Sequence, residues 1–180
     1  MKEYSVRLLE VNDIDRIADY WLLSDSDYLT GLGVDLQKLP SRDDFRSMLE
    51  GQLGLPNEEK QAFALIWMEK DAPIGHCNIN GIRFGEEAYM HLHLWNSRFR
   101  RKGAGEYLVR LSIPIFFDQF KLKRLICMPY ALNEAPNRVL AKLGFELVQE
   151  LVTVPGSINF EQPVKKWVLS REVSAKTGDK

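Results

Sequence analysis

Three apolar stretches between residues 61 and 95 constrain the fold of this chain more than any other feature. They are residues 61–69 (QAFALIWME), 73–84 (PIGHCNINGIRF) and 88–95 (AYMHLHLW), and only short turn sequences around Asp71 and Gly85 separate them. Strands joined by such short turns pair antiparallel with their chain neighbours. We therefore expect a three-strand antiparallel meander at the centre of the fold.

The rest of the chain alternates between strand-like and helical patterns around this meander. A long polar loop at 24–40, rich in Ser, Asp and Gly, interrupts the first part. The expected elements are a strand at 4–10, helices at 13–23 and 41–53, the meander, a helix at 103–118, a strand at 123–128, a helix from 133 to 144, and strands at 145–152 and 164–170. This order, β-α-α-β-β-β-α-β-α-β-β, predicts an α/β protein of the α+β type, with one mixed sheet and helices on both faces. Pro114 is expected to kink or split its helix.

Length and composition favour one globular domain. The chain has 180 residues, of which 45% are hydrophobic and 27% charged, so we expect a single domain at 1–173 and a flexible polar tail at 174–180. No apolar run approaches the roughly 20 residues of a membrane-spanning helix, and the N-terminal region lacks a secretory pattern. Two cysteines without a nearby partner suit a reducing compartment. The expected location is the cytoplasm, without a membrane partner.

The basic residues are balanced overall but concentrated at one place. With 24 Lys and Arg against 25 Asp and Glu, the net charge is -1, which argues against a general nucleic-acid binder. Gly103 and Gly105 open a helix, and glycine lets the free N–H groups of a helix start approach an anion closely. Four basic residues directly precede these glycines: Arg98, Arg100, Arg101 and Lys102. This pattern indicates a phosphate-bearing ligand, or else a solvated basic helix start.

Two common phosphate motifs do not fit this segment. A dinucleotide-binding fingerprint needs a third glycine or alanine where the chain has Leu108, and no Gly-Lys-Ser/Thr sequence of a P-loop is present. The phosphate site therefore has to be of another type.

All three histidines of the chain lie in the predicted meander. His91 and His93 are two residues apart on one strand, so they share a face with Trp95. If the second and third strands form a hairpin that turns near 84–85, His76 lies opposite His93. The cluster can supply a catalytic base, because imidazole titrates near neutral pH. It can also be a set of hydrogen-bonded residues that shape a pocket, or a three-histidine metal site.

The glycine-rich helix start resembles a known motif. Arg100-x-x-Gly103-x-Gly105 after an apolar strand is similar to the acetyl-CoA motif of the GCN5-related N-acetyltransferase (GNAT) superfamily. Asn133 and the sequence NRVLAKLGF at 137–145 resemble its second motif, with wording closest to the Rim-type enzymes that act on protein N-termini. The resemblance implies an acyl-CoA N-acyltransferase fold and transfer of an acetyl group from acetyl-CoA to a primary amine, by direct attack on the thioester and without a metal. The alternative is a CoA-binding sensor that has lost the transfer activity.

The same resemblance implies where the cofactor lies. The CoA pyrophosphate is expected on the backbone amides of residues 101–106, and pantetheine along Trp95, where the strands at 88–95 and 123–128 splay apart. Asn133 and Asn137 are expected near the thiol arm. The complete set of expected cofactor contacts is Trp95, Arg100, Arg101, Lys102, Gly103, Ala104, Gly105, Glu106, Asn133 and Asn137.

The catalytic residues depart from the pattern of the family. His91 stands where aralkylamine-type relatives also carry a histidine, so it is the first candidate for the base, and His93 is the second. Many relatives have a proton-donating Tyr where this chain has Leu140, and Rim-type members have a Ser where it has Pro136. Tyr130 is the candidate substitute; alternatively, it is a packing residue of a loop.

The family resemblance also indicates which segments select the acceptor. They are residues 24–40, the helix at 41–53 and the loop at 153–163. Asp25, Asp27 and Asp35 in the first segment are a weak indication of a cationic amine, since aspartate often only forms turns. The expected partner is a small-molecule amine or a peptide N-terminus, and no nucleic acid. The expected oligomeric state is a monomer or a homodimer.

Overall fold

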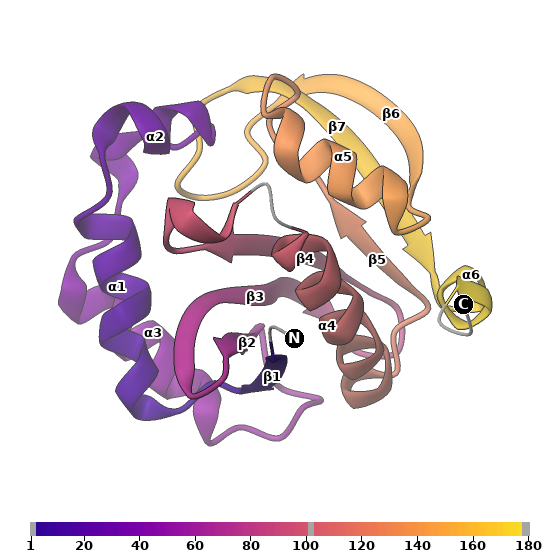
Figure 1. The fold of residues 1–180 in the computed structure, drawn as a ribbon, viewed down its shortest axis with the longest axis horizontal. Coiled ribbons are helices and arrows are strands. Elements are labelled where there is room, and N and C mark those ends of the chain that lie inside the picture. Colours follow the sequence, from indigo (N-terminus) through magenta and orange to yellow (C-terminus); the bar gives the residue numbers. More distant parts are fainter. Residues whose placement is uncertain (1–2, 101–102, 178–180) are drawn as a thin grey trace.

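The computed structural model describes residues 3–100 and 103–177, and its strands form one seven-stranded mixed sheet (Figure 1). The strand order is β1-β2-β3-β4-β5-β7-β6, in which only β4 and β5 run parallel. The predicted mixed α/β architecture is confirmed. The strands are β1 (Tyr4–Leu8), β2 (Ala62–Glu69), β3 (Ala72–Arg83), β4 (Glu87–Leu94), β5 (Arg124–Cys127), β6 (Glu146–Thr153) and β7 (Gln162–Ser170).

The predicted meander is β2, β3 and β4, with ends within two residues of those expected. The turn between β3 and β4 contains Gly85, whose φ of 77° lies in the left-handed region that glycine adopts without strain. This turn, together with a β-bulge between Asn80 and Arg83, sets a register in which His76 lies opposite His93 and Asn78 opposite His91. The expected pairing of His76 with His93 is therefore confirmed.

Helices cover both faces of the sheet (Figure 1). On one face, α1 (Ile14–Leu22), α2 (Ser26–Gly31) and α3 (Arg42–Leu53) pack on alternate residues of β2, including Ile66 and Met68. On the other face, α4 (Ala104–Phe120) and α5 (Glu134–Lys142) pack on Leu65 and Trp67. The alternation of β2 side chains explains why two separate clusters form. Within 3–100 and 103–177, no helix is long and apolar enough to cross a membrane.

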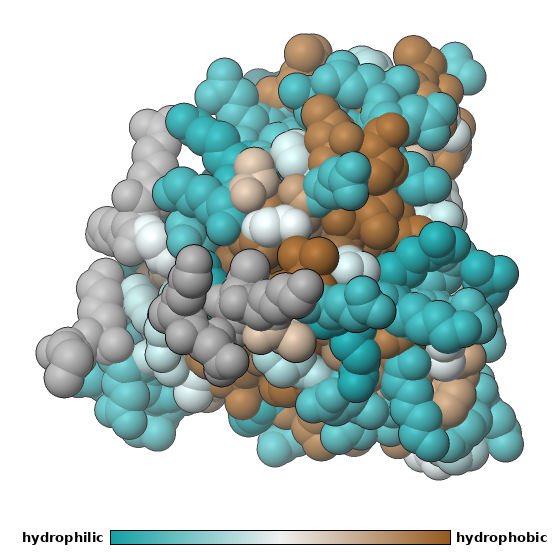
Figure 2. Space-filling view, turned by 90° about the vertical axis from the view of Figure 1, so that its right-hand side faces the viewer, coloured by the Kyte–Doolittle hydropathy of each residue, from teal (hydrophilic) through white to brown (hydrophobic). Residues whose placement is uncertain are grey.

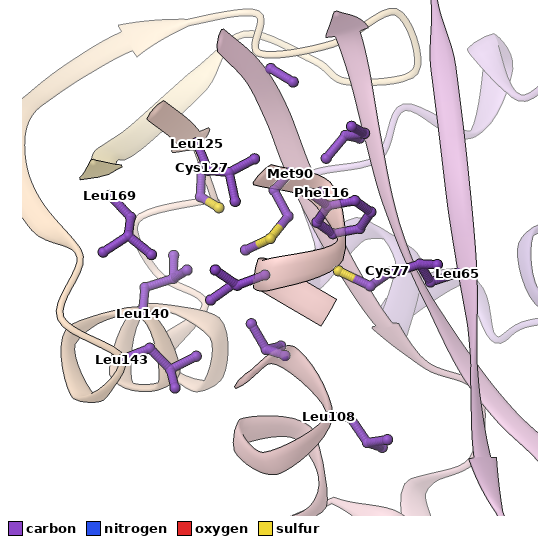
Figure 3. Packing of buried hydrophobic residues seen from close by; sticks show 14 of the residues in the cluster. Leu65, Cys77, Met90, Leu108, Phe116, Leu125, Cys127, Leu140, Leu143 and Leu169 are labelled. Atoms are coloured by element: carbon purple, nitrogen blue, oxygen red, sulfur yellow. The ribbon is translucent and has the colours of Figure 1, made fainter. Parts of the chain in front are cut away.

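The larger core lies between the sheet and the helices α4 and α5. Figure 3 shows Cys77, Met90, Phe116 and Leu140 from these elements in one apolar cluster. Each of these side chains is at most 1% exposed. Both cysteines of the chain are buried free thiols. Full burial of such side chains stabilises the packing of the two helices on the sheet by roughly 1.5–3 kcal/mol for each large apolar residue.

The segment 24–40 is more regular than expected. It contains the short helix α2 and a 3-10 turn at Leu36–Lys38. Asp25 caps α2, because its carboxylate accepts a hydrogen bond from the Tyr28 amide at 3.0 Å. Asp35 caps the 3-10 turn in the same way through the amide of Gln37, at 3.1 Å. These two aspartates thus stabilise local structure.

Two further expectations differ from the structure. The helix α4 runs continuously through Pro114, because this residue is exposed and the carbonyl that loses its partner, that of Arg110, can be hydrated. A helix, α6 (Arg171–Thr177), follows β7, so residues 174–177 are helical where a flexible tail was expected. Arg171 holds its start, since its guanidinium donates to the carboxylate of Asp118 on α4 at 2.9 Å.

The strand β6 forms one edge of the sheet. Figure 2 shows the side of the molecule on which β6, β7 and α6 lie, with apolar side chains gathered mainly in its upper half. Val148 and Val152 of β6 are 48% and 65% exposed. This edge therefore presents apolar side chains beside the charged Glu146 and Glu150, which are also exposed.

Candidate active site

The sheet opens between β4 and β5. These strands pair only from Glu87 to Tyr89, opposite Arg124 to Ile126, and no pair follows. The segment after β5 turns toward β7 instead, where the amide of Ala131 donates to the Pro163 carbonyl at 2.8 Å. The predicted splaying of the two strands is therefore present (Figure 1).

A cavity of about 580 Å³ passes through this gap. His91 and His93 line it from the face that carries α1 and α3, whereas Met90 and Leu140 line it from the face of α4 and α5. The segment 127–130 forms the opposite wall. A cavity of this size accommodates a small molecule, and its position lets two ligands meet from opposite sides of the sheet.

The start of α4 suits an anion. Gly103 precedes the first turn with a φ of 77°, and a Cβ at Gly105 would only come into ordinary contact, 3.5 Å from Leu94 Cδ1. The 17-residue helix behind it directs its positive end and its free N–H groups at this point. Ala104 is buried, and Glu106 forms an ion pair with Lys142 on α5 at 3.3 Å. The two other predicted contacts in this segment, Arg101 and Lys102, lie outside the described residues.

Arg100 connects this helix start to the first face of the sheet. Its guanidinium carbon lies 4.2 Å from the ring centroid of Tyr28 on α2, a cation–π contact. Its Nη2 also donates to the carbonyl of Leu94 at 3.4 Å. The anion-binding segment and the loop expected to contact the acceptor are thus physically joined.

Asn133 and Asn137, the two asparagines of the second motif, have different environments. Asn137 is buried, and its amide donates to the carbonyls of Tyr130 and Asn133 at 3.1 and 2.7 Å. Its Oδ1 accepts from the indole of Trp167 at 2.8 Å. Both N–H donors of Asn137 therefore hold the segment between β5 and α5. Asn133 lines the cavity, and its side chain makes no capping bond at the start of α5.

The three histidines form one cluster on the face of α1 and α3. The rings of His76 and His93 are stacked with centroids 4.6 Å apart. Trp95 donates its indole N–H to His76 Nδ1 at 2.7 Å, and His91 Nε2 lies 3.2 Å from Asn80 Oδ1. The predicted clustering is confirmed. The side chain of Trp95 belongs to this cluster, whereas the expectation was only that Trp95 lies beside the gap.

The surroundings keep these imidazoles neutral at physiological pH. Burial lowers the pKa of His76 to about 3, with a further contribution from His91. Burial also lowers the pKa of His91 to about 4. The pKa of His93 lies well below its usual value because of burial and its two histidine neighbours.

The hydrogen bonds distinguish the three rings chemically. An indole N–H can only donate, so the lone pair of His76 is on Nδ1 and is taken up by Trp95. The side-chain oxygen of Asn80 can only accept, so His91 carries its proton on Nε2 and its lone pair on Nδ1. His91, which lines the cavity, therefore has the lone pair of its Nδ1 available, whereas the Nδ1 lone pair of His76 is occupied by Trp95.

Two tyrosines and a tryptophan near His93 were missed in the sequence. The hydroxyl of Tyr20 on α1 lies 3.3 Å from His93 Nδ1 and 3.1 Å from the hydroxyl of Tyr28. The ring of Trp21 meets the His93 ring edge-on, with centroids 4.9 Å apart. The contacts of Tyr20 and Trp21 with His93 join residues about 70 positions apart, so no local pattern could have indicated them.

Tyr130 lies on the wall of the cavity opposite the histidines. Its ring packs edge-on against Phe160, with centroids 6.0 Å apart, and its backbone pairs with Val164 of β7. Leu140 and Pro136, which replace the usual proton donors, also line the cavity. Among the described residues, the cavity therefore offers Tyr130 as a hydroxyl on this wall, close to the β4–β5 gap.

A metal site does not arise from the histidine cluster. Within the part of the chain that the structure describes, no group of three His, Cys, Asp or Glu side chains could hold a metal ion. His76 and His93 stack face to face instead of converging on one point.

Comparisons with known proteins agree with this geometry. Residues 5–146 match a family model described as an acetyltransferase (GNAT) domain, and no curated protein sequence matches the chain. Many solved structures have similar folds, and three serve as examples. One is a spermidine N-acetyltransferase from Vibrio cholerae with CoA and spermine (TM-score 0.78, 15% identity, 96% of this chain and 98% of that one). Another is a ribosomal-protein-S5-alanine acetyltransferase from Vibrio fischeri (TM-score 0.77, 21% identity, 96% and 95% covered). A further one is an aminoglycoside acetyltransferase with coenzyme A and kanamycin (TM-score 0.73, 20% identity, 97% and 99% covered).

Proposed function

The chain belongs to the GNAT family of acetyltransferases, and on that premise we propose that it transfers the acetyl group of acetyl-CoA to a primary amine bound beside His91. The observation that carries this proposal is the cavity through the gap between β4 and β5. It brings a neutral imidazole with an available lone pair into the same space that Asn133, at the start of α5, lines from the cofactor side.

The residues around the gap fit CoA, the co-substrate of the family. Phosphate oxygens would accept from the N–H groups at the start of α4, where Gly103 and Gly105 leave the backbone accessible. Arg100 would add a positive charge, and Asn133 would contact the thiol arm from α5. The acetyl group would then lie within the gap, between His91 and Tyr130.

The transfer requires three proton movements. The acceptor arrives as an ammonium, and His91 Nδ1 takes one proton from it, which frees the lone pair with which the amine nitrogen attacks the thioester carbonyl. The new C–N bond forms, the C–S bond breaks, and Tyr130 gives its hydroxyl proton to the departing thiolate. The nitrogen of the new amide loses its second proton, which restores the Tyr130 hydroxyl. Because burial lowers the pKa of His91 to about 4, its imidazole is unprotonated at neutral pH. The rate should therefore rise with pH as more of the acceptor reaches the site as the free amine.

Replacing Gly103 should weaken CoA binding, whereas the same backbone strain placed elsewhere in the fold should not. Gly103→Ala forces a Cβ onto a φ of 77°, which costs roughly 1–2 kcal/mol and displaces the N–H groups of the loop. Gly85→Ala is the matched control, because Gly85 has the same φ and no atom within 4 Å of an added Cβ, but lies in the turn between β3 and β4. Calorimetry should show CoA binding about tenfold weaker for Gly103→Ala only. Equal affinities in the two variants would contradict the placement of the phosphates.

Removing the Tyr130 hydroxyl should slow the chemical step. Tyr130→Phe keeps the ring contact with Phe160 and removes only the proton donor. We expect kcat to fall about tenfold or more, with the KM for acetyl-CoA nearly unchanged. Steady-state kinetics with an unchanged kcat would show that Tyr130 is a packing residue.

The activity itself is tested by binding followed by turnover. CoA and acetyl-CoA should each raise the unfolding temperature, and acetyl-CoA should then release free thiol with members of a panel of alkylamines, arylalkylamines and peptides. Stabilisation without thiol release on any acceptor would indicate a CoA-binding sensor. No stabilisation by either ligand would contradict both functions.

A further inference from the structure

The cavity extends from the histidines into a trough beneath α1 and α3. Its roof is apolar, and its outer end opens to solvent beside Met48 of α3, which is 52% exposed. The roof residues are Ile17, Trp21, Phe45, Met48 and Leu49. A ligand that reaches His91 along this trough must therefore leave water and pack against apolar side chains.

The floor of the trough forms hydrogen bonds but carries no charge. It consists of the outward side chains of β3 and β4, among them Asn78, Asn80 and His91. Amide and neutral imidazole groups can pair with polar atoms such as those of a peptide backbone. They cannot neutralise a buried ammonium.

The trough also lacks acidic side chains. Among the described residues that line the cavity, none is Asp or Glu, and the only one that is not neutral is Lys60. Its ammonium donates to the carbonyls of Gln52 and Leu53 at the end of α3, and the residue is only 7% exposed. The Asp25 and Asp35 carboxylates, which the sequence offered for a cationic amine, cap local turns instead.

A second positive charge on the acceptor would thus be desolvated in this trough without a partner, close to a buried cation. We propose that the acceptor is monocationic: its reacting amine is its only positive charge, and an uncharged apolar group adjoins it. An alkyl or aryl amine has this chemistry, and so does a peptide N-terminus whose first side chains are apolar. The inference rests on the proposed transfer, since it assigns the acceptor of that reaction.

Matched acceptors test this assignment. Hexylamine and hexamethylenediamine differ only by a second ammonium, and pentapeptides that begin with Leu or Lys form the corresponding peptide pair. We expect the apolar member of a pair to have a kcat/KM at least about tenfold higher. The pair with the larger kcat/KM values shows whether the acceptor is a small-molecule amine or a peptide N-terminus. Equal or higher kcat/KM for the dicationic members would overturn the inference while leaving the acetyl transfer intact.

A binding measurement separates the inference from the proposed transfer. The four acceptors are titrated into the CoA-saturated protein in a calorimeter. The affinities measured in this way do not depend on turnover. Tighter binding of the apolar members without any turnover would support the trough assignment and contradict the transfer. Absence of binding by all four, or tighter binding of the dicationic members, would overturn the assignment.

One charge placed in the trough should change the preference. Met48→Glu introduces a carboxylate at the outer end of the trough. Ser47→Glu introduces the same charge on the preceding residue of α3, which does not line the cavity. The kcat/KM of hexamethylenediamine relative to hexylamine should rise about tenfold in Met48→Glu and stay unchanged in Ser47→Glu. Equal changes in both variants would show that the trough does not hold the acceptor.

Discussion

Lowering the pH from about 7.5 to about 5 should destabilise the protein by at least about 3 kcal/mol, because His76, His91 and His93 are held neutral. In the unfolded chain a histidine titrates near its ordinary pKa of about 6.5. In the folded protein, burial lowers the pKa of His76 to about 3 and that of His91 to about 4. Below about pH 6.5 the unfolded state therefore binds protons that the folded state does not, and stability falls until the folded pKa values are reached. Each fully neutral histidine contributes about 2 kcal/mol at pH 5, and less where it is partly exposed, as His91 is.

Urea unfolding at a series of pH values measures this loss. Between about pH 5 and 6.5 the histidines dominate, because carboxyl groups ordinarily titrate near pH 4. His91→Gln removes one of the groups, so the slope of the unfolding free energy against pH should be smaller in this variant than in the wild type. A wild-type stability that does not change over this range would show that the histidines are protonated in the folded protein.

Replacing His91 by glutamine should lower kcat about 100-fold or more, because the variant has no basic nitrogen at this position. The variant should bind CoA as the wild type does, since His91 lies on the acceptor face of the gap. The loss should be similar for every acceptor. It should become smaller at high pH, where the amine already reaches the site without its extra proton.

His93→Gln is the comparison that identifies the base. His93 lies two residues further along β4. Its ring packs against Tyr20 and Trp21, and its Nδ1 contacts the hydroxyl of Tyr20. If His91 is the base, His93→Gln should change kcat much less than His91→Gln does. The reverse order of the two effects in steady-state kinetics would move the role of base to His93.

Local features of the sequence were sufficient to predict the meander and the histidine cluster on it. Apolar alternation and a glycine turn fix the meander, and the turn at Gly85 together with a β-bulge between Asn80 and Arg83 sets His76 opposite His93. The helix predicted at 41–53 also forms, and it is capped locally, since the Ser41 hydroxyl accepts from the amide of Asp44 at 3.2 Å. Each of these features depends on residues close together in the chain, where propensity and turn chemistry act.

Long-range contacts account for what could not be predicted. The helix α2 is only six residues long and polar, and its packing beside β4 depends on Arg100, which lies about 70 residues away over the ring of Tyr28. The use of Asn137 as a structural residue depends on Trp167, whose position becomes adjacent only in the folded sheet. The neutral character of the trough likewise results from which residues of distant helices line it.

The transfer of the acetyl group is tested most directly by following both products at once. The protein is incubated with acetyl-CoA labelled in the acetyl group and with hexylamine, and free CoA and N-acetylhexylamine are quantified together. We predict that the two products form in equal amounts, and that omitting the amine abolishes CoA release. CoA release that is the same with and without the amine, or binding of acetyl-CoA with no labelled amide formed from hexylamine or from the Leu peptide, would contradict the proposed function.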